Sequence, residues 1–216
     1  QKAQDMRKLV TNHIERCVKK KEIQLKTRRE TKGMDLWKKK GELLTANIYA
    51  VPQGVTTFKT IDYYEESMPE IEIAIDPAKT PAENAQKYFA KYNKQKRTFE
   101  ALSQLIEETR EDIEYLEAIS NALDIARAEE DLVQIKEELT QTGYIRRRST
   151  KQKVRITSRP FHYISSDGYH IYVGKNNLQN EELTFHFASG NDWWFHAKKV
   201  PGSHVIVKSG GEELPD

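Results

Sequence analysis

Cysteine and long apolar runs are nearly absent from this 216-residue sequence. Cys17 is the single cysteine, which excludes an intramolecular disulfide framework and fits a reducing compartment. No run approaches the roughly 18 apolar residues of a membrane-spanning helix, so we expect no membrane partner and a cytoplasmic protein. The start, QKAQDMRKLV, has no initiator methionine and no apolar core of a signal peptide. We therefore expect the chain to be a fragment of a longer protein.

Charge is abundant but nearly balanced. Charged residues make up 31% of the chain and hydrophobic residues 37%, with a net charge of +2. This composition favours long solvated helices over one compact globule, and any case for nucleic acid depends on where the charge lies. One stretch without acidic residues runs from Leu139 to Ser166. Its cations are Arg146, Arg147, Arg148, Lys151, Lys153, Arg155 and Arg159.

A strict seven-residue hydrophobic repeat extends from Ala85 to Leu123. Such a narrow seam is typical of a coiled coil. Thr80 as N-cap, Pro81 at the first helical position and Glu83 as its capping-box partner predict where the helix begins. Forty helical residues reach about 60 Å. Residues 1–32 carry a weaker helical repeat and are the expected antiparallel partner.

The predicted fold is mainly α with an α+β part. A long antiparallel coiled coil carries a small tip with a helix between Gly33 and Gly54 and two strands. Asn121 is a candidate cap for a further short helix that ends at Gly143, and the pattern leaves open whether this stretch continues the long helix or folds back. A partial α+β domain follows. The expected segments are 1–32 with 81–142 (arm and base helix), 33–80 (tip), 143–160 (basic linker) and 161–216 (last domain).

The last domain is expected to be rich in strands. FHYISSDGYHIYVG predicts a hairpin turning at Asp167-Gly168, and LQNEELTFHFA favours a helix over a strand. DWWFHAK and SHVIVK predict two more strands. Alternation along DWWFHAK places Trp193 and Phe195 on one face and Trp194 and His196 on the other. We expect the first pair to be core and the second to be exposed.

Metal binding and hydrolysis are both disfavoured. The five histidines of this domain lack HxxxH or HxH spacing, and His162 and His170 share a face only if the hairpin loop has three residues. Asp192, His196, Ser203 and His204 include the residue types of a hydrolytic triad. However, no nucleophile elbow precedes Ser203 and no P-loop is present. We expect no metal, no cofactor and no enzymatic activity.

Nucleic-acid binding is better supported. The basic linker leads into a domain in which lysines and asparagines lie near aromatic residues, as backbone neutralisation and base stacking require. At the tip, Lys38, Lys39 and Lys40 can present charge to a large anionic partner. The alternatives are a linker that is only a solvated tether, and a tip helix that only builds a small core.

The last domain closely resembles the NFACT-R domain. The resemblance lies in DGYHIYVGKNNLQNEELTFHFASGNDWWFHAKKVPGSHVIV, which matches D-G-x-x-I-x-V-G-x-N-N-x-x-N-x-x-L-T and the later D-x-W-F/L-H and P-G-S-H-V blocks. GELLTANIY, the DPAKTPAENAQKYFAKYNK stretch and EEDLVQIKEEL resemble the coiled-coil and middle region of the same family. The NFACT proteins include RqcH and proteins often named fibronectin-binding protein A.

The resemblance implies a factor of ribosome-associated quality control. The implied partners are the large ribosomal subunit (rRNA and stalk-base proteins) and tRNA, and the implied role is to support C-terminal alanine tailing of stalled chains. The alternative is a surface adhesin that binds fibronectin. The candidate RNA- and ribosome-binding residues are Lys38, Lys39, Lys40, Arg146, Arg147, Arg148, Lys175, Asn176, Asn177, Asp192, Trp194, His196, Lys198, Ser203 and His204.

Overall fold

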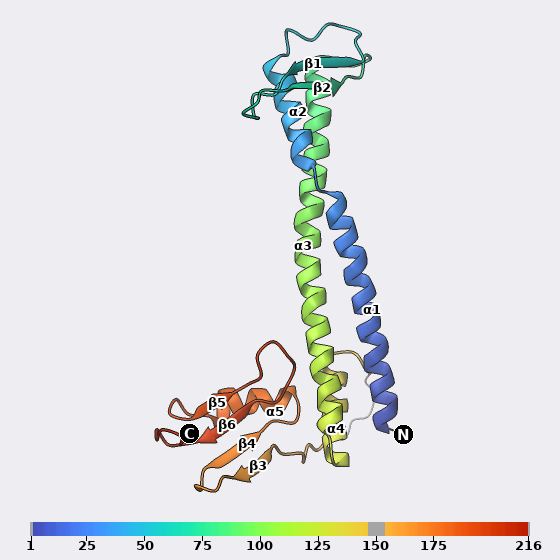
Figure 1. Ribbon diagram of the computed structural model, residues 1–216. Coiled ribbons are helices and arrows are strands. Elements are labelled where there is room, and N and C mark those ends of the chain that lie inside the picture. The colour runs from blue at the N-terminus through green and yellow to red at the C-terminus, as the bar shows by residue number, and fades with distance from the viewer. Residues whose placement is uncertain (1, 147–153, 216) are drawn as a thin grey trace. The chain divides into compact units, whose positions relative to one another are not determined.

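A computed structural model of the chain describes residues 2–146 and 154–215 (Figure 1). As the sequence predicts, the fold is mainly α with an α+β part. Two compact units form, one from residues 1–19 and 109–216 and one from residues 20–108. The elements are α1 (Lys2–Glu30), α2 (Met34–Ala46), β1 (Thr57–Ile61), β2 (Glu70–Ala74), α3 (Pro81–Ile125), α4 (Glu129–Gln141), β3 (Phe161–Ile164), β4 (His170–Val173), α5 (Asn177–Glu182), the π-helix η1 (Leu183–Phe187), β5 (Trp193–Phe195) and β6 (Val205–Lys208).

In the first unit, the beginning of α1 packs antiparallel to the end of α3. Arg7 bonds to Asp124 and to the Leu123 carbonyl, and Lys2 pairs with Glu129 at 2.6 Å. Helix α4 completes the base. The buried core of this base consists of Met6, Val10, Leu116, Ile119, Ala122, Leu123, Ile135 and Leu139. Leu116 and Leu123 belong to the predicted seam, whereas Ile119 and Ala122 add core positions outside it.

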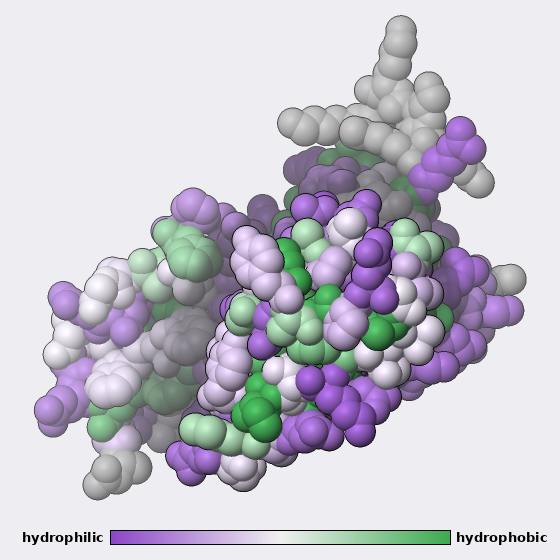
Figure 2. All heavy atoms as spheres, turned by 90° about the horizontal axis from the view of Figure 1, so that it is seen from above, coloured by the Kyte–Doolittle hydropathy of each residue, from purple (hydrophilic) through white to green (hydrophobic). Residues whose placement is uncertain are grey.

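The second unit contains α2, the β1–β2 hairpin and the adjoining parts of α1 and α3. The hairpin is antiparallel and pairs Phe58 with Ile73. Its apolar face, with Leu43 and Leu44 of α2, packs on the start of α3. Figure 2 shows this end of the molecule from above, with hydrophobic side chains (green) interspersed among hydrophilic ones (purple).

The capping box at the start of α3 is confirmed. The Glu83 backbone N–H donates to Thr80 Oγ1 at 3.2 Å, and the Thr80 N–H donates to Glu83 Oε2 at 2.7 Å. Two other boundaries were predicted wrongly. Helix α2 ends at Ala46, well before Gly54. Helix α3 runs past Asn121 to Ile125, because the adjoining Ala122 and Leu123 are buried in the core of the base.

The α+β part is a four-stranded antiparallel sheet in the order β3-β4-β6-β5. The predicted hairpin is confirmed, but its loop has five residues, since Ile164 pairs with His170. The stretch LQNEELTFHFA is helical, as the sequence analysis favoured. It changes from the α-helix α5 to the π-helical turn η1. Among the residues that the structure describes, no helix is long and apolar enough to cross a membrane.

Candidate nucleic-acid interface

Trp194, His196 and His204 lie together at one edge of the sheet. Trp194 belongs to the edge strand β5 and pairs with Ile206 of β6. Its ring lies edge-on to His204 at 5.3 Å and nearly parallel to His196 at 6.0 Å, while the two imidazoles are 5.0 Å apart. Trp194 is 48% exposed. The pairing of β5 with β6 thus brings His204 beside Trp194 and His196, which lie ten and eight residues earlier in the sequence.

The π-helical turn η1 supplies the fourth member of this cluster, Thr184. Its hydroxyl lies 2.7 Å from His204 Nδ1, and the Trp194 indole N–H donates to Thr184 Oγ1 at 3.2 Å. The indole is also 3.4 Å from His204 Nδ1. Because an indole N–H can only donate, Nδ1 is the accepting nitrogen and the proton of a neutral ring sits on Nε2. A neutral His204 ring therefore carries its N–H donor at Nε2.

His204 is held neutral at physiological pH. Burial lowers its pKa, and the neighbouring His196 lowers it further, although a backbone hydrogen bond with Asn180 acts in the opposite direction. Separately, the His204 backbone N–H donates to the Asn180 side-chain Oδ1 at 2.9 Å. The Asn180 amide in turn donates to the Gly202 carbonyl at 3.1 Å. Asn180 thereby fixes the loop before β6.

Gly174 makes the position of Asn180 possible. A Cβ atom at Gly174 would lie 2.0 Å from Asn180 Oδ1, so no other residue type fits without a shift. The sequence analysis did not assign a function to Asn180. The signal that points to it is the third asparagine of the motif GKNNLQN, one helical turn beyond Asn177.

Two lysines lie beside the ring cluster in the loop from residue 196 to 202. Lys198 and Lys199 are exposed, and Lys199 has a positive φ of 62°. A surface hollow of about 580 Å³ separates this loop from α3. Its lining residues are Arg110, Glu114, Glu117, Ala118, His196, Lys199, Val200 and Pro201. Cations, a neutral imidazole donor and an exposed indole are suited to phosphate and base contacts.

The Lys175-Asn176-Asn177 loop, expected to contact RNA, instead joins the last domain to α4. Lys175 pairs with Asp131 at 3.0 Å, Asn176 donates to Gln134 at 2.8 Å and Asn177 donates to Glu138 at 2.9 Å. Asn176 is buried and also caps α5 by accepting from the Gln179 N–H. The assignment of this loop to RNA contact is corrected, because its polar groups are used internally.

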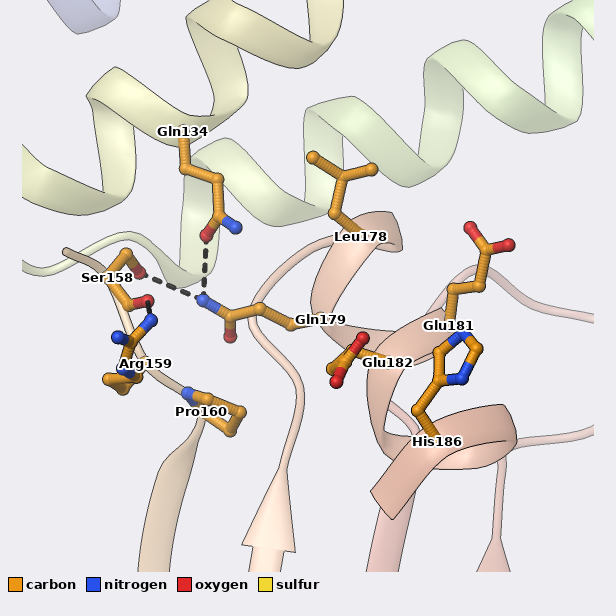
Figure 3. Close-up of a pocket in the computed structure, with 9 residues that line it drawn as sticks. All are labelled: Gln134, Ser158, Arg159, Pro160, Leu178, Gln179, Glu181, Glu182 and His186. Carbon is orange, nitrogen blue, oxygen red and sulfur yellow. Dashed lines mark hydrogen bonds between the residues drawn. The ribbon is translucent and has the colours of Figure 1, made fainter. Parts of the chain in front are cut away.

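Gln179 extends the same network. Its amide donates to Gln134 at 2.8 Å and to Ser158 at 2.9 Å, as Figure 3 shows. A hollow of about 520 Å³ lies beside it, with Arg159, Glu181, Glu182 and His186 among its lining residues. The mixture of acidic and basic groups gives this hollow no clear preference for a polyanion.

Burial raises the pKa of two carboxylates of α4, but their net pKa shifts are opposite. Burial raises the pKa of Asp131, but hydrogen bonds from Ser158, the Arg127 and Ala128 backbones and Lys175 outweigh it, so the pKa is lowered overall. Burial also raises the pKa of Glu138, and there the bonds from Asn177 and Tyr115 do not compensate. Glu138 Oε2 has no hydrogen-bond partner among the described residues.

Asp192, a candidate RNA-binding residue, joins the turn before β5 to β6. It accepts from the Ser189 N–H and hydroxyl at 2.8 Å each and pairs with Lys208 at 2.6 Å. Burial alone raises its pKa, but these partners lower it to about 2. Ser203 is half-buried in the same loop as Gly202.

The expectation that Trp193 and Phe195 form core is wrong. They are 44% and 45% exposed, because they lie on the sheet face opposite η1, where the edge strand β5 has a neighbour on one side only. The rings of Trp193 and Phe195 stack on each other at 6.4 Å. Exposure alone therefore does not distinguish the two aromatic pairs, whereas the contacts of Trp194 with Thr184 and His204 do.

The tip lysines do not form one charged patch. Lys39 pairs with Asp62 at 2.9 Å and with Glu65 at 2.8 Å, so its charge is already neutralised. Lys38 lies 3.8 Å from Glu42, and Lys40 lies 6.0 Å from the Trp37 ring. Lys39 is accordingly removed from the candidate binding residues. In the linker, Arg146 is exposed, whereas Arg147 and Arg148 lie outside the described residues.

The histidines of the hairpin pair with each other. His162 Nε2 lies 2.7 Å from His170 Nδ1, and the five-residue loop places both on the same face. A loop of three residues is therefore not required. Within residues 2–146 and 154–215, no group of three or more histidine, cysteine, aspartate or glutamate side chains is placed to hold a metal ion.

Comparisons with known proteins match the chain over its whole length. Residues 1–158 match the family model for NFACT N-terminal and middle domains, and residues 159–216 match the NFACT protein RNA binding domain. The Rqc2 homolog RqcH of Streptococcus suis is 42% identical over 208 residues, covering 96% of this chain and 37% of the relative. RqcH of Bacillus subtilis is 40% identical over 215 residues, covering 97% of this chain and 37% of the relative.

A solved structure has the same fold. The C-terminal part of the fibronectin/fibrinogen-binding protein from Streptococcus suis is 35% identical, with a TM-score of 0.74. The match covers 98% of this chain and 71% of that one. This chain thus spans little more than a third of the length of the curated relatives.

Proposed function

The chain belongs to the NFACT family, and from this membership we propose that it is an RNA-binding part of a ribosome-associated quality control factor. The observation that supports the proposal most is the cluster of Trp194, His196 and His204 beside Lys198 and Lys199. It lies within the segment that matches the RNA binding domain of the family. In this proposal the chain acts by binding, in the cytoplasm, and catalyses no reaction itself.

The proposed ligands are the large ribosomal subunit and tRNA. Lys198 and Lys199 neutralise phosphate, the exposed face of Trp194 stacks on an unpaired base, and His204 Nε2–H donates to an oxygen of the nucleotide. Asn180, Gly174 and the network on α4 hold these groups in place. In the complete factor, this binding supports the addition of alanine tails to stalled chains.

Binding to purified large ribosomal subunits tests the proposal through its salt dependence. Between 50 and 300 mM salt we expect affinity to fall steeply, because contacts with phosphates release counterions. Lys198→Gln/Lys199→Gln is expected to lower the slope of log affinity against log salt by about 1.4, at about 0.7 per contact with a single strand. Co-sedimentation at several salt concentrations measures this slope. Equal binding at 50 and 300 mM salt contradicts the proposal.

Fibronectin binding is the alternative, supported by the name of the Streptococcus suis protein with the same fold. An adhesin surface is expected to bind immobilised fibronectin saturably and with little salt dependence. The same protein preparation decides between the two. Saturable fibronectin binding without binding to ribosomal subunits or tRNA favours the adhesin.

A further inference from the structure

The second unit contains a strongly basic surface that none of the expected site residues describes. Between Glu83 and Glu100, α3 carries no acid and five cations: Lys87, Lys91, Lys94, Lys96 and Arg97. Residues 20–32 carry six cations and two acids. Both stretches lie side by side, since Arg28 bonds to Ser103 at 3.5 Å and lies 5.7 Å from the Phe99 ring. The charge of this unit is thus concentrated where α1 ends.

A hollow of about 360 Å³ opens within this basic surface. It is lined by Thr27, Glu30, Thr31, Trp37, Lys91, Lys94, Gln95 and Thr98, from α1, α2 and α3. Trp37 stacks on Tyr88 at 5.8 Å, and Lys91 Nζ lies 4.5 Å from the Trp37 ring centre. Among the described residues, neither Lys91 nor Lys94 has a carboxylate within ion-pair distance. Their charges therefore remain available to an anion.

Gln95 gives the hollow a specific polar feature. Its Oε1 atom is buried and has no hydrogen-bond partner among the described residues. A buried acceptor without a partner costs free energy, and native structures rarely leave one without a function or a ligand. A ligand with an N–H donor would satisfy it once the Gln95 side chain turns this oxygen toward the hollow that the residue lines. The hollow therefore offers two cations and an unsatisfied acceptor within about one helical turn of α3, an indole from α2 and one carboxylate, Glu30, from α1.

We propose that this hollow seats one unpaired nucleotide of RNA, which adds a second RNA contact to the one proposed above and rests on that function. Lys91 and Lys94 bind its phosphate, Gln95 Oε1 accepts from an N–H of its base, and the Trp37 indole supplies an apolar wall. An acidic peptide fits less well, because carboxylates pair with the lysines but provide neither a flat ring nor a base edge.

Two double variants of α3 test the charge. Lys91→Gln/Lys94→Gln removes the cations that line the hollow, and Lys96→Gln/Arg97→Gln removes two cations from other sides of the same helix. The probe is a single-stranded RNA of about 12 nucleotides, measured by fluorescence anisotropy. The first variant is expected to lower the salt slope by about 1.4, and the control to change it far less. Equal reductions overturn the inference.

Gln95→Leu tests the acceptor without endangering the fold. Replacing an unsatisfied buried oxygen by an apolar side chain of similar size is expected to keep or raise thermal stability and to lower RNA affinity. If Gln95 had only a structural role, its replacement would not lower RNA affinity while thermal stability is kept or raised. Unchanged RNA affinity overturns the inference, as does stronger competition by polyglutamate than by RNA of the same charge.

The Lys198→Gln/Lys199→Gln variant separates this inference from the proposed function. If that variant alone weakens RNA binding, the last domain binds RNA and the hollow does not. If Lys91→Gln/Lys94→Gln alone weakens it, the hollow binds RNA and the proposed cluster at Trp194 is wrong. If the unmodified chain does not bind RNA, both proposals are wrong.

Discussion

Asp131→Ala is expected to lower the free energy of unfolding of the first unit by about 3–5 kcal/mol. The Asp131 carboxylate is buried and accepts four hydrogen bonds, from Ser158, Lys175 and the backbones of Arg127 and Ala128. Its removal leaves the Lys175 ammonium largely buried without a counter-charge and leaves two N–H groups at the start of α4 unpaired. Urea denaturation followed by circular dichroism measures the loss.

Glu130→Ala is the matched control, because Glu130 is an exposed acid in the same helical turn. Its loss is expected to stay within about 1 kcal/mol, the size of an interaction with the helix dipole. Asp131→Ala/Lys175→Met is expected to recover part of the stability, since it removes the uncompensated charge. Equal losses for Asp131→Ala and Glu130→Ala would show that the network on α4 does not stabilise this unit.

The same carboxylate predicts a pH dependence. The pKa of Asp131 is lowered in the folded state, so its contribution is present above the unfolded pKa of about 3.9 and is lost as pH falls through the folded pKa. Glu138 has a raised pKa, so its contribution is present below about 4.3 and is lost as pH rises through the folded pKa. In Asp131→Ala, the free energy of unfolding should therefore fall less steeply as pH is lowered through the acid range. The contribution of Glu138 to its pH dependence should stay unchanged.

Trp194→Ala is expected to weaken binding to single-stranded RNA by about 1–3 kcal/mol, the value of stacking one base on an aromatic ring. The indole is 48% exposed and is held by Thr184 and His204, so its orientation is fixed before RNA binds. Fluorescence anisotropy with labelled RNA measures the affinity. Thermal denaturation of the same preparation verifies that the sheet remains folded.

Trp193→Ala provides the matched control on the opposite face of β5. Trp193 is similarly exposed, at 44%, and its indole donates only to the Glu212 carbonyl, at 3.3 Å. We expect its RNA affinity to change much less than that of Trp194→Ala. A larger loss for Trp193→Ala would place the stacking surface on the other face of the sheet.

Local signals in the sequence were sufficient for most elements of the fold. The capping box of Thr80 and Glu83 and the seam of α3 depend on residues close in sequence, and both are confirmed. The start of the predicted base helix could not be located from local signals. Asn121 is a good N-cap by type, but burial of the adjoining Ala122 and Leu123 favours continuing α3. Tertiary packing overrides a local preference there.

The candidate site was harder to predict, because its contacts join distant segments. Nothing near Asn176 in the sequence shows that its amide meets Gln134, 42 residues earlier. The acids of α4 and the amides of GKNNLQN are complementary, but only the fold shows that they are adjacent. Alternation correctly separated Trp194 from Trp193, whereas it could not show which sheet face η1 would cover.

Ultraviolet crosslinking of bound RNA, with crosslinked peptides identified by mass spectrometry, tests the central claim most directly. With the chain bound to large ribosomal subunits at low salt, we predict RNA crosslinks within residues 194–204, at Trp194, His196 or Lys198. Crosslinks in the α5 network around Asn176 should be absent, because that residue is buried. RNA crosslinks confined to peptides outside residues 194–204 would contradict the account.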